Sequence, residues 1–186
     1  VLLQPRCVLG LATGSSPIGT YEKLVEAHRA GRLDFSQVRT VNLDEYCGLS
    51  GDNPQSYRYF MEKHLFSQVN LPQGSTHLPN GTAPDMEAEA RRYEALVESL
   101  GYADLQLLGI GNNGHIAFNE ANEDHLVAVA HTEKLTQSTI DANARFFEKK
   151  EDVPTMAITM GMGDIMAAKQ VVLVATGLAK VPPLKG

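Results

Sequence analysis

The stretch Leu105-Gln-Leu-Leu-Gly-Ile-Gly-Asn-Asn-Gly-His-Ile-Ala-Phe-Asn-Glu120 passes from a short apolar run into glycines, then into one histidine and one carboxylate. The run at residues 105–110 is too short for a helix and too apolar for an edge strand. It therefore predicts a strand buried on both faces of a parallel sheet. Ligands of such sheets bind at the carboxyl ends of the strands. His115 and Glu120, the only ionisable side chains of the stretch, are candidates for chemistry on a small molecule.

The same stretch has the spacing Gly109-x-Gly111-x-x-Gly114, which formally matches the dinucleotide-binding fingerprint. That fingerprint requires a long apolar helix after the glycines and an acidic residue about 20 positions further on. Polar and acidic side chains at positions 119, 120 and 122–124 follow instead. We interpret the glycines as an active-site loop, in which they allow positive φ and close approach of the backbone to a ligand. For His115, a buried and hydrogen-bonded structural role remains the alternative to a role in a pocket.

Length and composition indicate one globular domain, residues 1–186, with a sizeable core: 186 residues, 43% hydrophobic and 20% charged. The net charge of -6 and the scattered basic residues argue against a nucleic-acid partner. Cys7 and Cys47 are too few for a disulfide scaffold, and no stretch resembles a signal peptide or a membrane span. These features predict a cytoplasmic protein with no membrane partner. Cys47 is a candidate nucleophile, although a small buried side chain is the commoner role.

The turn Gly14-Ser-Ser-Pro17 joins a predicted strand at residues 8–13 to a predicted helix at residues 18–30. Pro17 suits the first helical position, and Ser15 or Ser16 can cap the helix. Free backbone amides and the helix dipole make such a turn a natural anion site. An ordinary capped turn has the same features, so both interpretations stay open. No Gly-Lys-Ser/Thr follows, which argues against a nucleotide P-loop.

A second predicted strand, residues 38–43, ends at Asp44-Glu45-Tyr46 and brings carboxylates to the same edge of the sheet. Beside Tyr46 and Leu43, desolvation would disfavour the charged form of Asp44 and help it act as a base near neutral pH. Capping a helix or a turn suits an aspartate equally well. Asp44 is therefore a second candidate for the site, with the capping role left open.

The remaining elements continue an alternation of strands and helices. We expect helices from Asn53-Pro54 through Leu65, at 85–100 and at 138–147, and strands at 126–130, 156–159 and 170–175. The first of these helices has an apolar stripe that we interpret as core. Such an alternation predicts an α/β fold with a parallel sheet covered on both faces and with its strand ends gathered on one side.

Four motifs, in this order and spacing, resemble the glucosamine-6-phosphate deaminase family over nearly the whole chain. They are Leu11-Ala-Thr-Gly-Ser-Ser-Pro17, Asn42-Leu-Asp-Glu-Tyr46, Gly109-Ile-Gly-Asn-Asn-Gly-His-Ile-Ala-Phe-Asn-Glu120 and Ala142-Asn-Ala-Arg-Phe-Phe147. The resemblance implies a Rossmann-like three-layer sandwich with a mostly parallel sheet. It also implies conversion of an amino-sugar phosphate, glucosamine 6-phosphate, to fructose 6-phosphate and ammonia without a metal or a redox cofactor. It leaves open whether the protein is a monomer or a homo-oligomer.

The resemblance assigns the catalytic roles residue by residue. Asp44 matches the base that moves a proton between C2 and C1 of the open-chain sugar, and His115 matches the residue that assists ring opening. Glu120 matches the carboxylate that orients this histidine, a pairing also found in catalytic triads. Asn113 stands where family members have Asp or Asn, and the uncharged side chain should make His115 less readily protonated.

The resemblance also assigns the substrate phosphate. The turn at Gly14 and Ser15 matches the family's cradle, and Arg145 and Lys180 match the cations that complete it. A bidentate Arg fits a phosphate well.

Three features depart from the family pattern. After Glu120 the family continues with Pro-Gly into a longer lid, whereas this chain reads Ala121-Asn-Glu-Asp-His125. Consecutive prolines at 182 and 183 are expected to interrupt the helix that follows Lys180. The family's opening strand before Val8 and its last helix and strand are also absent. The domain is therefore expected to lack parts of the N-terminal strand, the lid and the C-terminal elements. Either the sequence is a fragment, or segments have been left out and the residues on either side of them joined.

Other functions give different expectations. A 6-phosphogluconolactonase would share the fold and a histidine, but the Asn42–Tyr46 motif favours the deaminase. A sugar-phosphate sensor would lose the base, whereas Asp44, His115 and Glu120 are all present. His115, Glu120, Asp124 and His125 are possible metal ligands, but the two histidines are ten positions apart with no helical pattern between them. We expect no metal.

Overall fold

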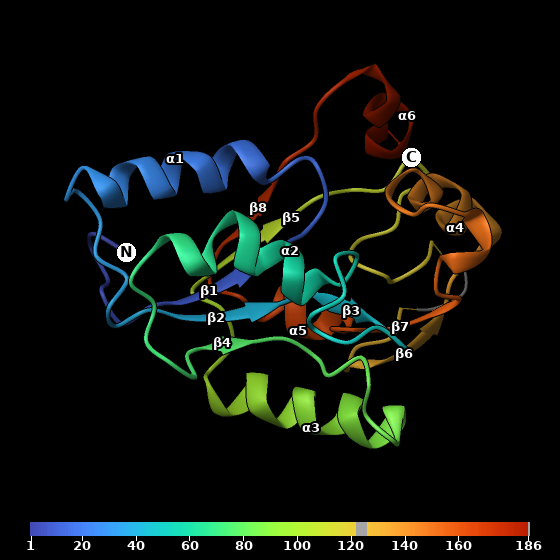
Figure 1. The fold of residues 1–186 in the computed structure, drawn as a ribbon, viewed down its shortest axis with the longest axis horizontal. Coiled ribbons are helices and arrows are strands. Elements are labelled where there is room, and N and C mark those ends of the chain that lie inside the picture. Colours follow the sequence, from blue (N-terminus) through green and yellow to red (C-terminus); the bar gives the residue numbers. More distant parts are fainter. Residues whose placement is uncertain (122–125, 186) are drawn as a thin grey trace.

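A parallel five-stranded sheet forms the centre of the protein (Figure 1). The computed structural model describes residues 1–121 and 126–185. In spatial order the strands are β4 (Thr76–His77), β2 (Arg39–Asn42), β1 (Val8–Leu11), β5 (Leu105–Leu108) and β8 (Val171–Leu173). Every neighbouring pair in this sheet is parallel. The predicted α/β fold with a mostly parallel sheet is confirmed.

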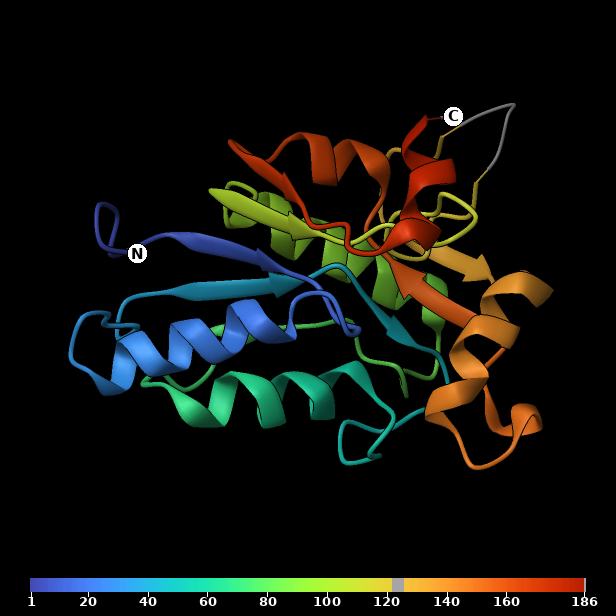
Figure 2. The ribbon, with the colours of Figure 1, turned by 90° about the horizontal axis from the view of Figure 1, so that it is seen from above.

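Helices cover both faces of this sheet and give three layers (Figure 2). Helices α1 (Ile18–Arg29) and α2 (Tyr57–His64) lie on one face, and α3 (Met86–Ser99) and α5 (Met162–Met166) lie on the other. The remaining helical segments are α4 (Gln137–Asn143), α6 (Val181–Lys185), η1 (Phe66–Gln68), η2 (Ala144–Phe146), η3 (Lys150–Asp152) and η4 (Leu178–Lys180). Among the described helices, none is long and apolar enough to cross a membrane.

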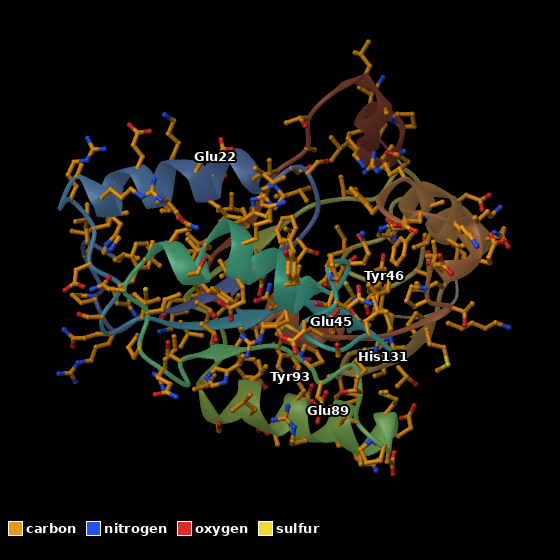
Figure 3. The ribbon with its side chains drawn as sticks, in the orientation of Figure 1. Glu22, Glu45, Tyr46, Glu89, Tyr93 and His131 are labelled. Atoms are coloured by element: carbon orange, nitrogen blue, oxygen red, sulfur yellow. The ribbon has the colours of Figure 1, made fainter. Side chains whose placement is uncertain are left out.

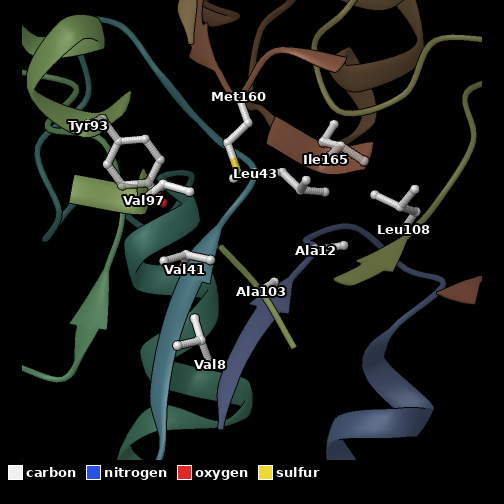
Figure 4. Packing of buried hydrophobic residues seen from close by; sticks show 10 residues of the cluster. All are labelled: Val8, Ala12, Val41, Leu43, Tyr93, Val97, Ala103, Leu108, Met160 and Ile165. Atoms are coloured by element: carbon white, nitrogen blue, oxygen red, sulfur yellow. The ribbon is translucent and has the colours of Figure 1, made fainter. Parts of the chain in front are cut away.

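The apolar strand residues pack against the helices on each face. On one face Val8 and Val41 meet Tyr93 of α3 and Ile165 of α5, and the last two side chains are fully buried (Figure 4). On the other face the core contains Leu11 and side chains of α1 and α2. Burial on both faces explains why β1 and β5 are mostly apolar, with Gln106 as the buried polar exception in β5.

A second, antiparallel sheet adjoins the first and was not expected from the sequence. Its order is β3 (Asp44–Tyr46), β7 (Met156–Thr159) and β6 (His131–Lys134). The chain leaves the parallel sheet after Asn42, and the Leu43 carbonyl accepts the Met160 amide at 2.7 Å. The strand at 156–159 therefore exists but belongs to this antiparallel sheet.

The predicted strand at 126–130 is wrong, because the strand begins only at His131. The carbonyls of Val127 and Ala128 instead accept the amides of Met162 and Gly163, at 2.8 and 2.9 Å. These amides belong to the first turn of α5, so this part of the segment caps a helix and its two carbonyls do not take part in a strand ladder.

The expected interruption of the helix after Lys180 is also wrong. The one-turn helix α6 contains both prolines, at positions 182 and 183. A proline is compatible with the first turn of a helix, where its missing N–H is not needed.

Candidate active site

A pocket of about 550 Å³ opens at the carboxyl ends of β1 and β5. Its lining includes six of the predicted site residues, which are Gly14, Ser15, Asp44, His115, Arg145 and Lys180. These residues come from the loops after β1 and β5, from β3, from η2 and from η4, which follows β8. The predicted convergence of strand ends therefore forms a real cavity.

Asp44 is the first residue of β3, and its side chain is almost completely buried at the pocket wall. No described residue donates a hydrogen bond to its carboxylate. Burial, and then the negative charge of Glu45, raises the pKa of Asp44 well above its ordinary value. An unpartnered carboxyl with a raised pKa is suited to accept a proton near neutral pH. The capping alternative for Asp44 has no support among the described contacts.

The imidazole of His115 lies directly on the backbone of Gly111. A Cβ on Gly111 would be 2.4 Å from two atoms of the ring, so only glycine allows this position. This close approach is the role of Gly111, whereas Gly114 takes the positive φ, at 93°. Burial, and then the positive charge of Lys180, lowers the pKa of His115, and Glu120 opposes this change. The ring is therefore neutral at neutral pH.

Asn113 connects His115 to Glu120. Its Oδ1 accepts the backbone N–H of His115 at 3.3 Å, and its Nδ2 donates to Oε2 of Glu120 at 3.1 Å. An aspartate could donate this second bond only when protonated, so the asparagine fits a charged Glu120. Neither Asn113 nor Glu120 lines the pocket.

Glu120 is held in place by the start of α4. Its Oε1 accepts the backbone N–H and the hydroxyl of Thr136, at 3.0 and 3.1 Å. Burial acts to raise the pKa of Glu120, but hydrogen bonds from Thr139, Thr136 and Asn113 lower it overall. Glu120 is thus a fixed negative charge near the imidazole.

The two predicted cations share the pocket with the turn after β1. Nζ of Lys180 donates to the carbonyl of Ile110 at 2.5 Å, and the Arg145 guanidinium lies 4.6 Å from the centre of the Phe146 ring. Burial, and then the nearby charge of Arg145, lowers the pKa of Lys180. Two cations in one pocket favour an anionic ligand.

The start of α1 differs from the expected capped turn. Pro17 occupies the N-cap position, one place before the predicted one, and no side chain caps the helix, so neither Ser15 nor Ser16 has that role. Amides of the first turn without a side-chain partner are suited to an anion.

Four aromatic side chains form one wall of the pocket beside Asp44, and the sequence analysis did not predict this aromatic wall. Tyr46, Tyr57, Phe118 and Phe147 all line the pocket, and Tyr57 and Phe118 are stacked with centroids 5.7 Å apart. The stripe of α2 was interpreted as core, which holds for Met61 and Leu65, whereas Tyr57 and Phe60 face the pocket. These side chains come from separate segments, so no local pattern reveals the wall.

Cys47 does not line the pocket. Burial raises the pKa of its thiol to about 11, which disfavours the nucleophilic thiolate. Residues 122–125, which contain the altered lid and the possible metal ligands Asp124 and His125, lie outside the described residues. Over residues 1–121 and 126–185, no three His, Cys, Asp or Glu side chains are grouped so as to hold a metal.

A mostly parallel α/β fold with a buried carboxyl, a histidine and two cations in one pocket is typical of an enzyme that acts on an anionic small molecule. Residues 3–186 match the sequence model of one family, described as glucosamine-6-phosphate isomerases/6-phosphogluconolactonase, and the chain belongs to this family.

Curated relatives are similar over almost the whole chain. A glucosamine-6-phosphate deaminase of Lachnoclostridium phytofermentans is 58% identical over 177 residues, covering 95% of this chain and 75% of the relative. One from Clostridium beijerinckii is 53% identical over 179 residues, covering 96% and 74%.

Solved structures of the same family have a similar fold. A structure described as a monomeric glucosamine-6-phosphate deaminase superposes with a TM-score of 0.91 at 45% identity, covering 96% of this chain and 74% of that one. The 6-phosphogluconolactonase of Thermotoga maritima gives a TM-score of 0.75 at 22% identity, covering 97% and 75%, and shares the fold.

Proposed function

We propose that this chain is a glucosamine-6-phosphate deaminase, which isomerises and deaminates glucosamine 6-phosphate to fructose 6-phosphate and ammonia in amino-sugar catabolism. The observation that carries this function is one pocket in which the Asp44 carboxyl faces the same cavity as His115 and the cations Arg145 and Lys180. Among the described residues, none donates a hydrogen bond to this carboxyl. The high identity to glucosamine-6-phosphate deaminases supports the same function.

Ring opening is the role of His115. Because its lowered pKa favours the neutral imidazole, the ring can accept the proton of the anomeric hydroxyl and return it to the ring oxygen as the bond from C1 to that oxygen breaks. The charge of Glu120 stabilises the imidazolium that forms, and Asn113 fixes both partners.

Isomerisation and deamination follow on the open-chain sugar. Asp44 takes the proton from C2 to give an enolamine and returns it to C1. The oxygen on C1 gains a proton and the nitrogen loses one, so that C1 becomes a hydroxymethyl carbon and C2 becomes an imine. Water then adds to C2, and ammonia leaves. The raised pKa of Asp44 suits both halves of this transfer, because the carboxyl has to accept and then donate the proton.

The phosphate is bound by Arg145, Lys180 and the turn at Gly14 and Ser15, which line the same pocket as Asp44 and His115. Binding energy at this non-reacting group positions C1 and C2 for the proton transfer. Acid and base groups are sufficient for every step, so we propose that the enzyme needs no metal or other cofactor.

The proposal extends to the domain, its location and its partners. We propose that residues 1–186 act as one sugar-phosphate isomerase domain in the cytoplasm, with a small-molecule amino-sugar phosphate as partner and with no nucleic-acid or membrane partner. The proposal holds for a monomer and for a homo-oligomer.

The decisive experiment measures ammonia release from glucosamine 6-phosphate beside the hydrolysis of 6-phosphogluconolactone. We expect ammonia and fructose 6-phosphate in equal amounts and no lactone hydrolysis above the spontaneous rate. Lactone hydrolysis without ammonia release would establish the alternative hydrolase. Saturable binding of the sugar phosphate without turnover of either substrate would establish the sensor.

A further inference from the structure

Glu45 is a buried carboxylate beside the proposed base, and the mechanism above does not use it. Its side chain is 2% exposed and comes from β3, one position after Asp44. Its Oε1 accepts the backbone N–H of Tyr46 and of Tyr57, and its Oε2 accepts the backbone N–H of Arg58, all at 2.9 Å. One carboxylate thus takes three main-chain hydrogen bonds. Figure 3 labels Glu45 and its neighbour Tyr46 on the fold.

Two of these bonds hold the start of α2. Tyr57 and Arg58 are the first two residues of this helix, and the third amide, of Tyr59, is already bound by the Ser56 hydroxyl at 3.0 Å. A negative charge is favourable at a helix N-terminus, and hydrogen bonds to a carboxylate are stronger than neutral ones. Glu45 therefore fastens the first turn of α2 to β3.

This contact decides where the aromatic wall lies. Tyr57, whose amide Glu45 binds, lines the pocket and has its ring 4.9 Å from that of Tyr46. Adjacent side chains of a strand point to opposite faces, so Glu45 lies behind the strand that presents Asp44 and Tyr46. A shift of the α2 start would move the wall that desolvates Asp44.

A neighbouring loop packs closely against Glu45. A Cβ on Gly81 would lie 3.3 Å from Cγ of Glu45 and 2.1 Å from the carbonyl oxygen of Tyr46. Glycine at position 81 thus lets this loop pack against the stem of Glu45, whose carboxylate is held by the three main-chain hydrogen bonds.

We propose that Glu45 is a positioning residue of the reaction, which clamps the first turn of α2 to β3 and thereby sets the aromatic wall over Asp44. This inference rests on the deaminase function proposed above. A second consequence is electrostatic. The Glu45 charge is the main influence after burial that raises the pKa of Asp44, so its removal should let Asp44 ionise at lower pH.

The test compares Glu45→Gln with a capping carboxylate elsewhere. Asp85 caps α3 by accepting the Ala88 amide at 2.9 Å and does not line the pocket, so Asp85→Asn is the matched control. For Glu45→Gln we expect the acidic limb of the kcat/KM profile to move to lower pH by roughly 1 unit, the scale of a neighbouring charge. For Asp85→Asn, which keeps a capping oxygen and loses only the charge, we expect at most a small loss of thermal stability and an unchanged profile.

A second variant, Glu45→Asp, keeps the charge and shortens the clamp. Its acidic limb should stay near that of the wild type, while kcat should fall by up to roughly 100-fold, the effect of a displacement of about 1 Å. If Glu45→Gln does not fold, Glu45→Asp alone serves as the test. A kcat equal to that of the wild type in Glu45→Asp overturns the inference.

A Glu45→Gln profile that superposes on the wild type, or an equal shift in Asp85→Asn, also overturns the inference. These outcomes require that the wild-type chain releases ammonia. A wild-type chain that releases none refutes the proposed function itself, so the two failures are distinguishable.

Discussion

Nδ1 of His115 lies 3.9 Å from Oε2 of Glu120, too far for a hydrogen bond. The same carboxylate oxygen accepts Nδ2 of Asn113 at 3.1 Å. The carboxylate therefore acts on the ring through its charge, and Asn113 supplies the geometric connection. Catalytic hydrogen bonds are often long in the absence of substrate and shorten when it binds, so this distance is compatible with the orienting role of Glu120.

Replacing Asp44 by Asn keeps the shape of the side chain and removes the proton acceptor. Turnover should fall by roughly 10²–10⁴, the contribution of general acid–base catalysis, with a smaller effect on KM. Steady-state kinetics of ammonia release measures both constants. Asp52→Asn, an exposed acid outside the pocket lining, serves as the control. A near-normal turnover in Asp44→Asn would remove this residue from the mechanism.

Truncating Arg145 or Lys180 to Ala should weaken binding of the phosphorylated sugar. We expect KM to rise more than kcat falls, because the phosphate takes no part in bond breaking. Lys169→Ala removes a surface cation that is paired with Asp104 and should leave both constants unchanged. Normal KM values in both pocket variants would show that the phosphate cradle is elsewhere.

Adding one methyl group at Gly111 should displace His115. In Gly111→Ala the new Cβ would lie 2.4 Å from the imidazole, so the ring or the loop has to move, and turnover should fall by at least roughly 100-fold. Gly109→Ala is the comparison on the same loop, because a Cβ there meets no atom within 4 Å. Equal losses in the two variants would argue that the loop, and not the position of the histidine, is affected.

Stability should depend on pH through Asp164. Burial, and then contact with Glu94, raises the pKa of Asp164 to about 7. Since an aspartate titrates near 4 in the unfolded chain, the folded protein binds the additional proton between about pH 4 and pH 7, and stability falls as pH rises through this range.

Asn at position 164 mimics the protonated acid, because it can still accept the Gly161 amide and can donate to Glu94. Asp164→Asn should therefore flatten the pH dependence of the unfolding midpoint and be at least as stable as the wild type at pH 8. Urea unfolding at a series of pH values measures this, and parallel curves for the two proteins would contradict the assignment.

The sequence alone determined the features that are encoded locally. The apolar run before the glycines located β5, and the turn before Ile18 located both the start of α1 and one side of the pocket. The same reasoning placed Asp44 and His115 at one edge of the sheet, because parallel strands bring their carboxyl ends together. Each of these features depends on a few consecutive residues.

Only the tertiary structure decided the features that join distant segments. The antiparallel pairing of β3 with β7 joins residues more than a hundred positions apart, and the aromatic wall joins Tyr57 to Phe118. The hydrogen bond from the Arg58 amide to Glu45 likewise could not be predicted from the sequence, which shows only a carboxylate after a predicted strand. Periodicity and turn chemistry report the conformation of one segment, whereas the partner of a buried carboxylate or aromatic ring is fixed by packing between segments.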